Sequence, residues 1–182
     1  MSERPPYLPG DRAPADERAR MIRVDQAGEY GATRIYQGQL AVLRRGRGAG
    51  AIREMANQEQ RHLAQFDRLT AERRVRPTAL SPLWHIAGYA LGAATALLGE
   101  RAAMACTVAV EEVIDAHYAR QAEQLAGSDL ELAEAIAAAR ADELAHRDIA
   151  LSHEATEALG YELISGAIKS GARLAIWLSE RI

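Results

Sequence analysis

The chain has 182 residues, of which 48% are hydrophobic, and this length and apolar content suit one folded domain with a substantial core. Its formal net charge is -3, from 22 basic and 25 acidic residues spread along the chain, which argues against a nucleic-acid-binding protein. The single cysteine, Cys106, excludes an intrachain disulfide and a thiolate zinc site, and it fits a reducing compartment.

The N-terminal segment, residues 1–15, is polar and contains four prolines. It lacks the apolar stretch of a secretory signal and the arginine-rich amphipathic pattern of a transit peptide, so we expect a flexible tail. Residues 16–182 are expected to form a single domain. Because strand-like alternation is nearly absent while Ala, Leu, Arg, Glu and Gln dominate, we expect this domain to be all-α.

Two helices are predicted in the first part of the domain. The first runs from Asp16, as its N-cap, to Arg44, whose charge suits the negative end of the helix dipole. A cluster of three glycines that begins at Gly46 predicts a turn. The second helix is predicted to end near Arg74, because prolines follow it.

An uncharged stretch of 23 residues separates Arg76 from Glu100. A helix over residues 82–98 would span about 25 Å at 1.5 Å per residue, which suits a crossover along a bundle. The stretch also meets the length criterion for a transmembrane helix. Its glycines and polar residues, and the need for both flanks to return to one bundle, instead favour a hydrophobic crossover helix that lies at a membrane interface.

Three more helices are predicted in the second half of the chain. The first covers residues 100–126 and ends at Gly127. Ser128 or Asp129 is expected to cap the next helix, which is predicted to continue to Leu159. Residues 161–180 are predicted to form a C-terminal amphipathic helix.

Two Glu-x-x-His units occur, at residues 59–62 and 143–146, and this spacing puts both side chains of a unit on one helix face. One such unit alone is more often a solvated polar face than a metal site. Di-iron bundles of the ferritin-like class, however, use a Glu-x-x-His from each of two helices and one inward Glu from each of the other two. The chain supplies a candidate for every position of that pattern: Glu29, Glu59, His62, Glu111, Glu143 and His146.

The positions of the turns support one shared site. Ligands that are level with each other in an antiparallel hairpin must be equally far from the connecting turn. The midpoint between Glu29 and the unit at 59–62 falls beside Gly46, and that between Glu111 and the unit at 143–146 falls beside Gly127. We therefore expect a ferritin-like four-helix bundle that binds two metal ions. Metal would neutralise four buried carboxylates, and the carboxylate and imidazole ligands favour iron, with manganese as the other candidate.

The ligand on the fourth predicted helix has competitors. Glu112 follows Glu111 directly and Asp115 lies one turn beyond it. Glu111 shares a helix face with Tyr118, which stands seven residues later, and this favours Glu111.

Further polar residues are candidates for places around the site. Tyr36 and Tyr118 each stand seven residues after a predicted glutamate ligand, so they either line the metal pocket or are ordinary core tyrosines. Asp142 either orients a ligand histidine from another helix or lies on the surface. His117 is a weaker candidate for a place beside the ligands.

With these residues in place, the chain closely resembles the demethoxyubiquinone hydroxylase family of ubiquinone biosynthesis, over residues 21–182. The matching stretches are RVDQAGEYGA (23–32), IYQGQ (35–39), EQRH (59–62), CTVAVEE (106–112), HY (117–118) and ELAHRDI (143–149).

The resemblance implies a di-iron monooxygenase that uses O2 to hydroxylate the ring of a polyprenyl demethoxy-benzoquinone, in the penultimate stage of ubiquinone biosynthesis. It implies Glu111 rather than Glu112 as the ligand. It also implies catalytic roles for His117 and Tyr118, in electron transfer. The electrons are expected to come from an external reductant such as NADH, because the chain has no flavin or nicotinamide fold of its own.

A quinone with a long isoprenoid tail resides in the bilayer. We therefore expect the protein to be peripheral on the cytoplasmic face of a bacterial cell membrane, with its apolar helices against the membrane surface. A lipid-presenting partner from ubiquinone biosynthesis and a homo-oligomer are further expectations. The alternative reading is a ferritin-type protein that oxidises or stores iron without an organic substrate.

Overall fold

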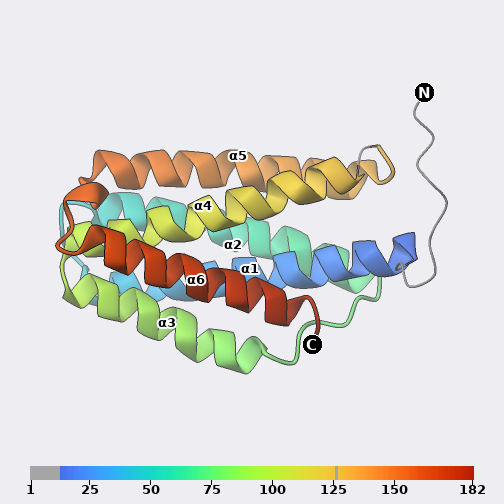
Figure 1. The fold of residues 1–182 in the computed structure, drawn as a ribbon, viewed down its shortest axis with the longest axis horizontal. Helices are drawn as coiled ribbons and strands as arrows, with labels where there is room; N and C mark the ends of the chain where they lie inside the picture. The colour runs from blue at the N-terminus through green and yellow to red at the C-terminus, as the bar shows by residue number, and fades with distance from the viewer. Residues whose placement is uncertain (1–12, 126) are drawn as a thin grey trace.

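The computed structural model describes residues 13–125 and 127–182, so most of the expected N-terminal tail lies outside the described residues. Within these ranges the chain is helical and contains no strand, which confirms the all-α prediction (Figure 1). The elements are α1 (Pro14–Val42), α2 (Ala49–Glu72), α3 (Ser81–Leu97), α4 (Glu100–Leu125), α5 (Leu130–Ser152), the short 3-10 helix η1 (Ala155–Glu157) and α6 (Tyr161–Ser179).

Helices α1, α2, α4 and α5 form a ferritin-like four-helix bundle, and α3 and α6 pack on its outside (Figure 1). The first two bundle helices make one antiparallel hairpin, and α4 and α5 make the other. The connection between the two hairpins, which consists of the loop after α2 and then α3, runs along the bundle as predicted for the crossover, and α3 packs on α1. Helix α6 runs antiparallel to α3 and packs on α4. The described part of the chain thus consists of two similar halves, α1 to α3 and α4 to α6.

The apolar core is divided into two main clusters, one toward each end of the bundle. One is built around Met21, Phe66, Leu125, Leu132 and Ile136, all nearly inaccessible to solvent. The other is built around Ile52, Met55, Met104 and Val108. Burying each such side chain contributes about 1.5–3 kcal/mol. The predicted ligands occupy the middle of the bundle between the two clusters, so apolar packing on both sides holds the polar centre in place.

Helix α3 lies unusually close to α1. A Cβ added at Gly92 would lie 1.9 Å from the carbonyl oxygen of Ile35, and one added at Gly38 would lie 2.2 Å from that of Tyr89. Only glycine permits this approach of two helix backbones. Gly88 and Gly92 therefore allow the crossover helix to pack closely against the bundle.

Three predicted helix ends were wrong. Helix α1 begins at Pro14 with Ala13 as its N-cap, so Asp16 lies in the first turn, where its charge still suits the helix dipole. The same helix ends at Val42, before Arg44. Helix α5 ends at Ser152 instead of Leu159, because Glu154 takes a left-handed conformation and turns the chain so that Ala155 enters the core.

Asp129, one of the two predicted caps of α5, is confirmed, since its side chain accepts a hydrogen bond of 3.2 Å from the backbone N–H of Leu132. Across the described residues, every helix falls short of the length and apolar character that spanning a membrane requires.

Candidate metal centre

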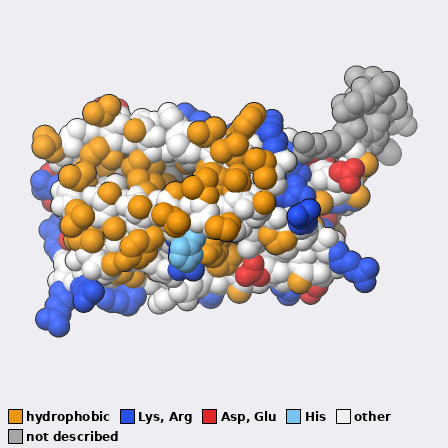
Figure 2. Space-filling view, turned by 90° about the horizontal axis from the view of Figure 1, so that it is seen from below, with side chains coloured by type: hydrophobic (Ala, Val, Ile, Leu, Met, Phe, Trp, Pro, Cys, Tyr) orange, Lys and Arg blue, Asp and Glu red, His pale blue; other side chains and the backbone are white. Residues whose placement is uncertain are grey.

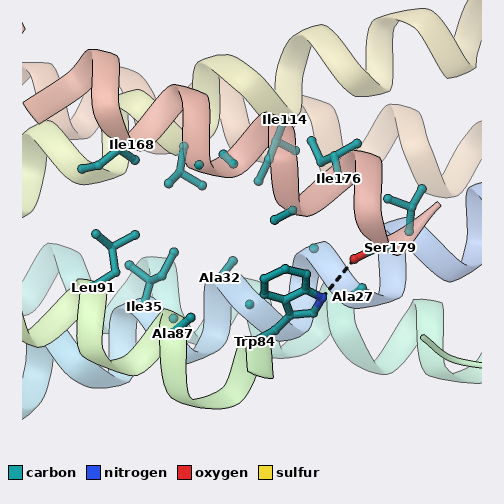
Figure 3. A pocket seen from close by; sticks show the side chains of 18 of the residues that line it. Ala27, Ala32, Ile35, Trp84, Ala87, Leu91, Ile114, Ile168, Ile176 and Ser179 are labelled. Carbon is teal, nitrogen blue, oxygen red and sulfur yellow. Dashed lines mark hydrogen bonds between the residues drawn. The ribbon is translucent and has the colours of Figure 1, made fainter. Parts of the chain in front are cut away.

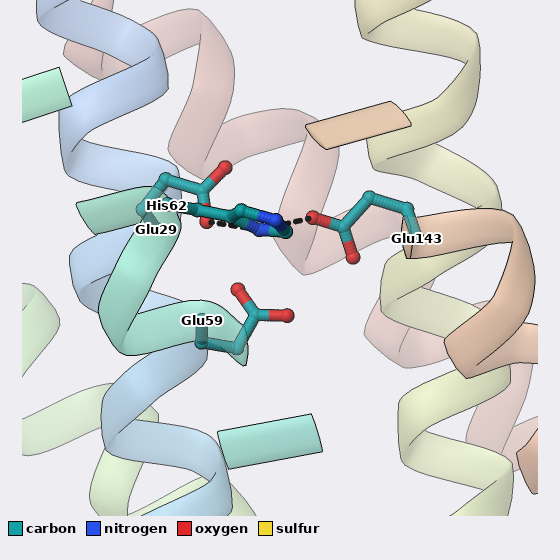
Figure 4. Close-up of side chains that lie close together, drawn as sticks. All are labelled: Glu29, Glu59, His62 and Glu143. Carbon is teal, nitrogen blue, oxygen red and sulfur yellow. Dashed lines mark ion pairs between the residues drawn. The ribbon is translucent and has the colours of Figure 1, made fainter. Parts of the chain in front are cut away.

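The structure brings all six predicted ligands together in the middle of the bundle. They form two overlapping groups whose ligand atoms lie within 4.8 Å of one another. The first group has Glu29 and His62, the second has Glu111 and His146, and both share Glu59 and Glu143. Figure 4 shows the first group, with side chains from α1, α2 and α5 converging on one point. Two four-residue groups that share Glu59 and Glu143 could hold a pair of metal ions.

Each histidine turns its Nδ1 atom toward the carboxylates. Nδ1 of His62 lies 3.7 Å from Glu29 Oε2 and 3.8 Å from Glu143 Oε1. Nδ1 of His146 lies 3.0 Å from Glu59 Oε1 and 3.3 Å from Glu143 Oε2. The ring nitrogens that would bind metal therefore face the oxygens that would bind the same metal.

The opposite nitrogen of each ring is held from the other hairpin. Nε2 of His62 donates a 3.0 Å hydrogen bond to Asp142 Oδ2, which confirms the prediction that Asp142 orients a histidine from another helix. Nε2 of His146 donates a 2.8 Å hydrogen bond to Gln58 Oε1. A ring whose Nε2 carries the proton keeps the lone pair on Nδ1, so both bonds select the tautomer that can bind a metal at Nδ1.

Sequence reasoning missed Gln58. Its signal was available, because Gln58 precedes Glu59 as Asp142 precedes Glu143, and each accepts a hydrogen bond from the histidine of the opposite unit. The two residues occupy corresponding positions but differ in type, since Gln58 carries an amide and Asp142 a carboxylate.

Buried polar atoms normally have hydrogen-bond partners, and each unpartnered one costs roughly 1–3 kcal/mol. The ligand atoms of this site depart from that rule. Among the described residues, buried atoms without a hydrogen-bond partner include Glu29 Oε2, both oxygens of Glu59 and Glu143, Glu111 Oε2, and Nδ1 of His62 and His146. All of them point into the same space. Their number and their oxygen and imidazole chemistry fit two ferrous ions, which would satisfy every one of these atoms.

Repulsion among the buried glutamates is a second reason why the centre requires a cation. Burial and the neighbouring carboxylates, Glu143 foremost, raise the pKa of Glu59 and of Glu111 well above the usual range. Burial and then the charge of Glu29 raise the pKa of Glu143 to about 8. Burial lowers the pKa of His146, which keeps that imidazole neutral, as a ligand must be. Without metal the centre retains protons; with metal, the cations would replace them.

The two tyrosines bind the glutamates across the hairpins. The hydroxyl of Tyr36 on α1 donates a 2.8 Å hydrogen bond to Glu111 Oε1 on α4. The hydroxyl of Tyr118 on α4 donates a hydrogen bond to Glu29 on α1. Burial and the nearby carboxylates raise the pKa of both tyrosines well above the ordinary value, so both remain donors. Both therefore line the metal pocket and are not merely core residues.

The competitors of Glu111 lie elsewhere. Glu112 is paired with Lys169 of α6 at 2.5 Å, and Asp115 accepts a 2.6 Å hydrogen bond from Arg140 of α5. Neither belongs to a group of potential metal ligands in the described part of the chain. Their exclusion leaves Glu111 as the residue of α4 that faces the centre.

His117 lies outside both ligand groups. It is buried, and its Nε2 lies 3.2 Å from Oδ1 of Asp25 on α1, while Gln121 donates a 2.8 Å hydrogen bond to the same oxygen. Burial raises the pKa of Asp25. Sequence reasoning missed Asp25 as the partner of His117, because the two are 92 residues apart. No spacing rule connects residues on helices that meet only in the folded bundle.

An apolar cleft of about 500 Å³ lies between α3 and α6, over the outer faces of α1 and α4 (Figure 3). Its floor includes Gly28 and Val110, the chain neighbours of Glu29 and Glu111, together with Ala32 and Ile114. Almost every lining side chain is aliphatic. The cleft therefore places an apolar binding space directly behind the two helix segments that carry the unshared glutamates.

Comparisons with known proteins agree with this arrangement. The family model described as ubiquinone biosynthesis protein COQ7 matches residues 16–179. The chain is 58% identical over 176 residues to a 3-demethoxyubiquinol 3-hydroxylase of Rhodospirillum rubrum, an alignment that covers 96% of this chain and 83% of that protein. It is 52% identical over 167 residues to the human NADPH-dependent 3-demethoxyubiquinone 3-hydroxylase, mitochondrial, covering 90% and 77%. It is 41% identical over 202 residues to the 5-demethoxyubiquinone hydroxylase, mitochondrial, of Saccharomyces cerevisiae, covering 100% and 87%. The chain therefore belongs to the COQ7 family of ubiquinone biosynthesis proteins.

Proposed function

We propose that this chain is a di-iron enzyme that uses O2 to hydroxylate the ring of demethoxyubiquinone. The relatives described above are named as hydroxylases of demethoxyubiquinol or demethoxyubiquinone. The observation that carries the proposal is the position of the apolar cleft, whose floor residues Gly28 and Val110 adjoin the ligands Glu29 and Glu111. A quinone ring with an isoprenoid tail is an apolar molecule of the kind that such a cleft binds.

The overall reaction requires O2, two electrons and two protons from outside the chain. A ring C–H becomes C–OH with one atom of O2, and the other oxygen atom leaves as water after taking two electrons and two protons. We propose a nicotinamide nucleotide as the source of the electrons, in line with the NADPH dependence in the name of the human relative. Iron bound at the centre would supply the redox chemistry that O2 requires.

The residues of the chain orient the candidate metal ligands and keep water out of the cleft. Tyr36 and Tyr118 hold one oxygen of Glu111 and Glu29, which leaves the other oxygen of each carboxylate for metal. Asp142 and Gln58 keep the two imidazoles turned to the centre. The aliphatic lining of the cleft excludes water, which would otherwise compete with the quinone for this space.

We further propose that the face formed by α3 and α6 rests on a membrane. Figure 2, which looks onto the molecule from below the view of Figure 1, shows hydrophobic side chains across most of the face, with basic side chains toward its ends. Large side chains on this face are strongly exposed: Ile86 (69%), Leu97 (75%), Leu98 (71%), Leu163 (80%) and Trp177 (50%). An apolar face of this kind lies in the headgroup region of a bilayer without crossing it. A tailed quinone would then reach the cleft without passing through water.

Vesicle flotation tests the membrane proposal. Leu97→Glu and Leu163→Glu should abolish binding to phospholipid vesicles, because each places a charge in the apolar face. Leu130→Glu is the matched control, since Leu130 is equally exposed (70%) but lies at the start of α5, on the bundle away from α3. Equal binding by all three variants would contradict the proposal. A lipid-presenting partner and a homo-oligomer stay predictions.

Reconstitution tests the enzymatic proposal. Metal-free protein is loaded anaerobically with ferrous iron, then mixed with demethoxyubiquinone, a nicotinamide nucleotide and O2, and the quinone is analysed by mass spectrometry. We expect two irons per chain and a product heavier by one oxygen atom, which carries label from ¹⁸O2. The ferritin-type alternative predicts instead that many irons are taken up and oxidised while the quinone stays unchanged.

A further inference from the structure

Trp84 closes one end of the apolar cleft. Its indole ring stands inside the cleft near Ala27 of α1, and its Nε1–H donates a 3.0 Å hydrogen bond to the hydroxyl of Ser179, the last residue of α6 (Figure 3). Ser179 is buried, with 2% of its surface exposed. Among the described residues, this is the one hydrogen bond that joins α3 to α6. The two helices that form the sides of the cleft are thus tied together at this end.

An ion pair holds the Ser179 end of this hydrogen bond against the bundle. Glu180, the residue after Ser179, pairs with Arg20 of α1 at 2.5 Å, so the end of α6 cannot move outward freely. Arg20 also hydrogen-bonds Glu17 on its own helix, which fixes the guanidinium. Trp84 therefore has a rigid acceptor, and its ring is held in one orientation.

The rest of the cleft offers no comparable polar group. Among the residues that line it, only Trp84 and Ser179 have a polar side-chain atom, and each satisfies the other. From Trp84 the cleft continues along α1 past Gly28 and Gly31, and it ends between Leu91 of α3 and Ile168 of α6. One end is closed by a wide, fixed aromatic side chain, while the other is lined by flexible aliphatic ones.

The indole of Trp84, which forms the wall at this end of the cleft, stands close to the metal centre. Ala27, which Trp84 approaches, is two residues before Glu29 on α1, whereas Leu91 and Ile168 lie beside the part of the cleft that Ile35 lines. Gly28 and Gly31 have no side chain, and no heavy atom lies within 4 Å of a Cβ built on either. No side chain of Gly28 or Gly31 fills the floor beside the indole, and this part of the floor adjoins Glu29. A flat ring placed there would lie against the indole, with its tail on the side away from Trp84.

We propose that Trp84, held by Ser179, is a substrate-positioning residue that fixes the direction of the quinone in the cleft. The ring lies against the indole beside Gly28 and Gly31, and the isoprenoid tail extends along the cleft toward Leu91 and Ile168. This inference rests on the proposed function, because it takes a tailed quinone as the occupant. Its consequence is that the reacting ring carbon is presented to the metal centre in one orientation.

Fluorescence tests contact between the indole and the ring. The chain has two tryptophans, so Trp177→Phe leaves Trp84 as the only one. Excited indole loses its emission on contact with a quinone, which accepts an electron from it. Titration with a short-tailed quinone in detergent should therefore quench the emission of the metal-free Trp177→Phe protein with saturation, at least twofold. In the matched variant Trp84→Phe the remaining Trp177 lies outside the cleft, and its quenching should rise linearly without saturation.

Coupling of O2 use to hydroxylation tests the positioning role. In the iron-loaded enzyme, Trp84→Phe keeps an aromatic wall but loses the hydrogen bond, and Trp84→Ala removes the wall. We expect the fraction of consumed O2 that appears as hydroxylated quinone to fall in that order, by about twofold and then tenfold or more. O2 that is not inserted takes two electrons and two protons and is released as hydrogen peroxide. Ser179→Ala should resemble Trp84→Phe, and Glu54→Ala, at an exposed residue of α2, should resemble the unaltered protein.

Two results would overturn the inference while leaving the proposed function standing. One is normal coupling in Trp84→Ala, and the other is equal, unsaturable quenching of both tryptophans by a quinone that the enzyme hydroxylates. Failure of the unaltered, iron-loaded protein to hydroxylate any quinone would instead overturn the proposed function. If Trp84→Ala does not fold, the thermal midpoint reveals it, and Trp84→Phe with Ser179→Ala decides the outcome.

Discussion

The hydroxyl of Tyr36 lies 2.8 Å from Oε1 of Glu111, so a tyrosine of the first hairpin holds a ligand of the second. The converse bond, from Tyr118 to Glu29, makes the arrangement reciprocal. Each hairpin thus positions the metal ligand of the other, and neither hairpin is complete alone. The centre therefore depends on how the two hairpins dock, and substitutions around it can test that dependence.

Tyr36→Phe removes the hydroxyl and retains the ring. We expect a loss of about 0.5–1.5 kcal/mol in the free energy of unfolding of the metal-loaded protein, the usual net value of one hydrogen bond. Affinity for the iron of the Glu111 group should fall more than affinity for the other iron. Urea denaturation and anaerobic iron titration measure the two effects. Tyr30→Phe, which removes an exposed hydroxyl on the same helix, is the control, and an equal loss of iron affinity there would refute the assignment.

Glu59 and Glu143 belong to both ligand groups, whereas Glu29 and Glu111 belong to one each. Glu143→Ala should therefore abolish tight binding of both irons, and Glu29→Ala should leave about one per chain at equal concentrations. Metal analysis after gel filtration gives these values. Exposed Glu54 on α2 supplies the control, and Glu54→Ala should retain two irons. Retention of one iron by Glu143→Ala would show that its carboxylate does not bridge.

Asp142 and Gln58 act on the metal only through the histidines that they orient. Asp142→Ala should weaken the iron held by His62, and Gln58→Ala the iron held by His146, each by about 10–100-fold, as is typical for groups behind a ligand. Isothermal titration under anaerobic conditions can resolve the two sites. Asp148→Ala removes an exposed carboxylate from the same helix as Asp142 and should change neither affinity.

The stability of the metal-free protein should fall as pH rises from about 4.5 to about 8. The pKa of Glu143 is raised to about 8 from 4.5, and burial also raises the pKa of Glu59 and Glu111. Between the unfolded and folded pKa values the folded protein keeps protons that the unfolded chain has released, so the stabilisation present at low pH is lost as pH rises.

Scanning calorimetry in the presence of a chelator measures this slope. Glu143→Gln cannot ionise and should flatten it. Glu29 and Asp142 raise the pKa of His62 despite its burial, so this group adds to the fall in stability above pH 6.5. Burial lowers the pKa of His146, so that group opposes the fall below pH 6.5. In the iron-loaded protein the slope should reverse, because metal binding displaces protons and strengthens as pH rises. A metal-free midpoint that rises from pH 5 to 8 would contradict the prediction.

Gly92 and Gly28 offer a matched pair of glycine-to-alanine changes. A Cβ at Gly92 would lie 1.9 Å from the Ile35 carbonyl oxygen, so Gly92→Ala should push α3 from α1 and cost about 1–3 kcal/mol or more. A Cβ at Gly28 meets nothing within 4 Å, and alanine favours the helix by roughly 1 kcal/mol, so Gly28→Ala should be stable. Its methyl group narrows the cleft, however, and KM for the quinone should rise several-fold. Thermal midpoints and steady-state kinetics separate the two effects.

The sequence alone predicted the six candidate ligands that the structure brings together. Helix geometry is local, so a spacing of three residues puts Glu59 beside His62 and Glu143 beside His146 in any helical fold. Equal distances to the turns at Gly46 and Gly127 then predicted which glutamates would be level with these units. The same local signals identified the crossover and the C-terminal amphipathic helix, and they failed only at helix ends such as Ser152, where burial of Ala155 decided the path of the chain.

The tertiary structure decided everything that joins residues from different helices. It paired Tyr36 with Glu111, His117 with Asp25 and Trp84 with Ser179, and it turned Glu112 away toward Lys169. It also formed the cleft, whose two sides are 95 residues apart at the Trp84 end. No periodicity along one helix carries such information, because these contacts depend on the rotation and depth at which separate helices pack. The candidate metal ligands can therefore be identified from positions along each helix, whereas the side chains that hold them and the apolar cleft come together only when the helices assemble.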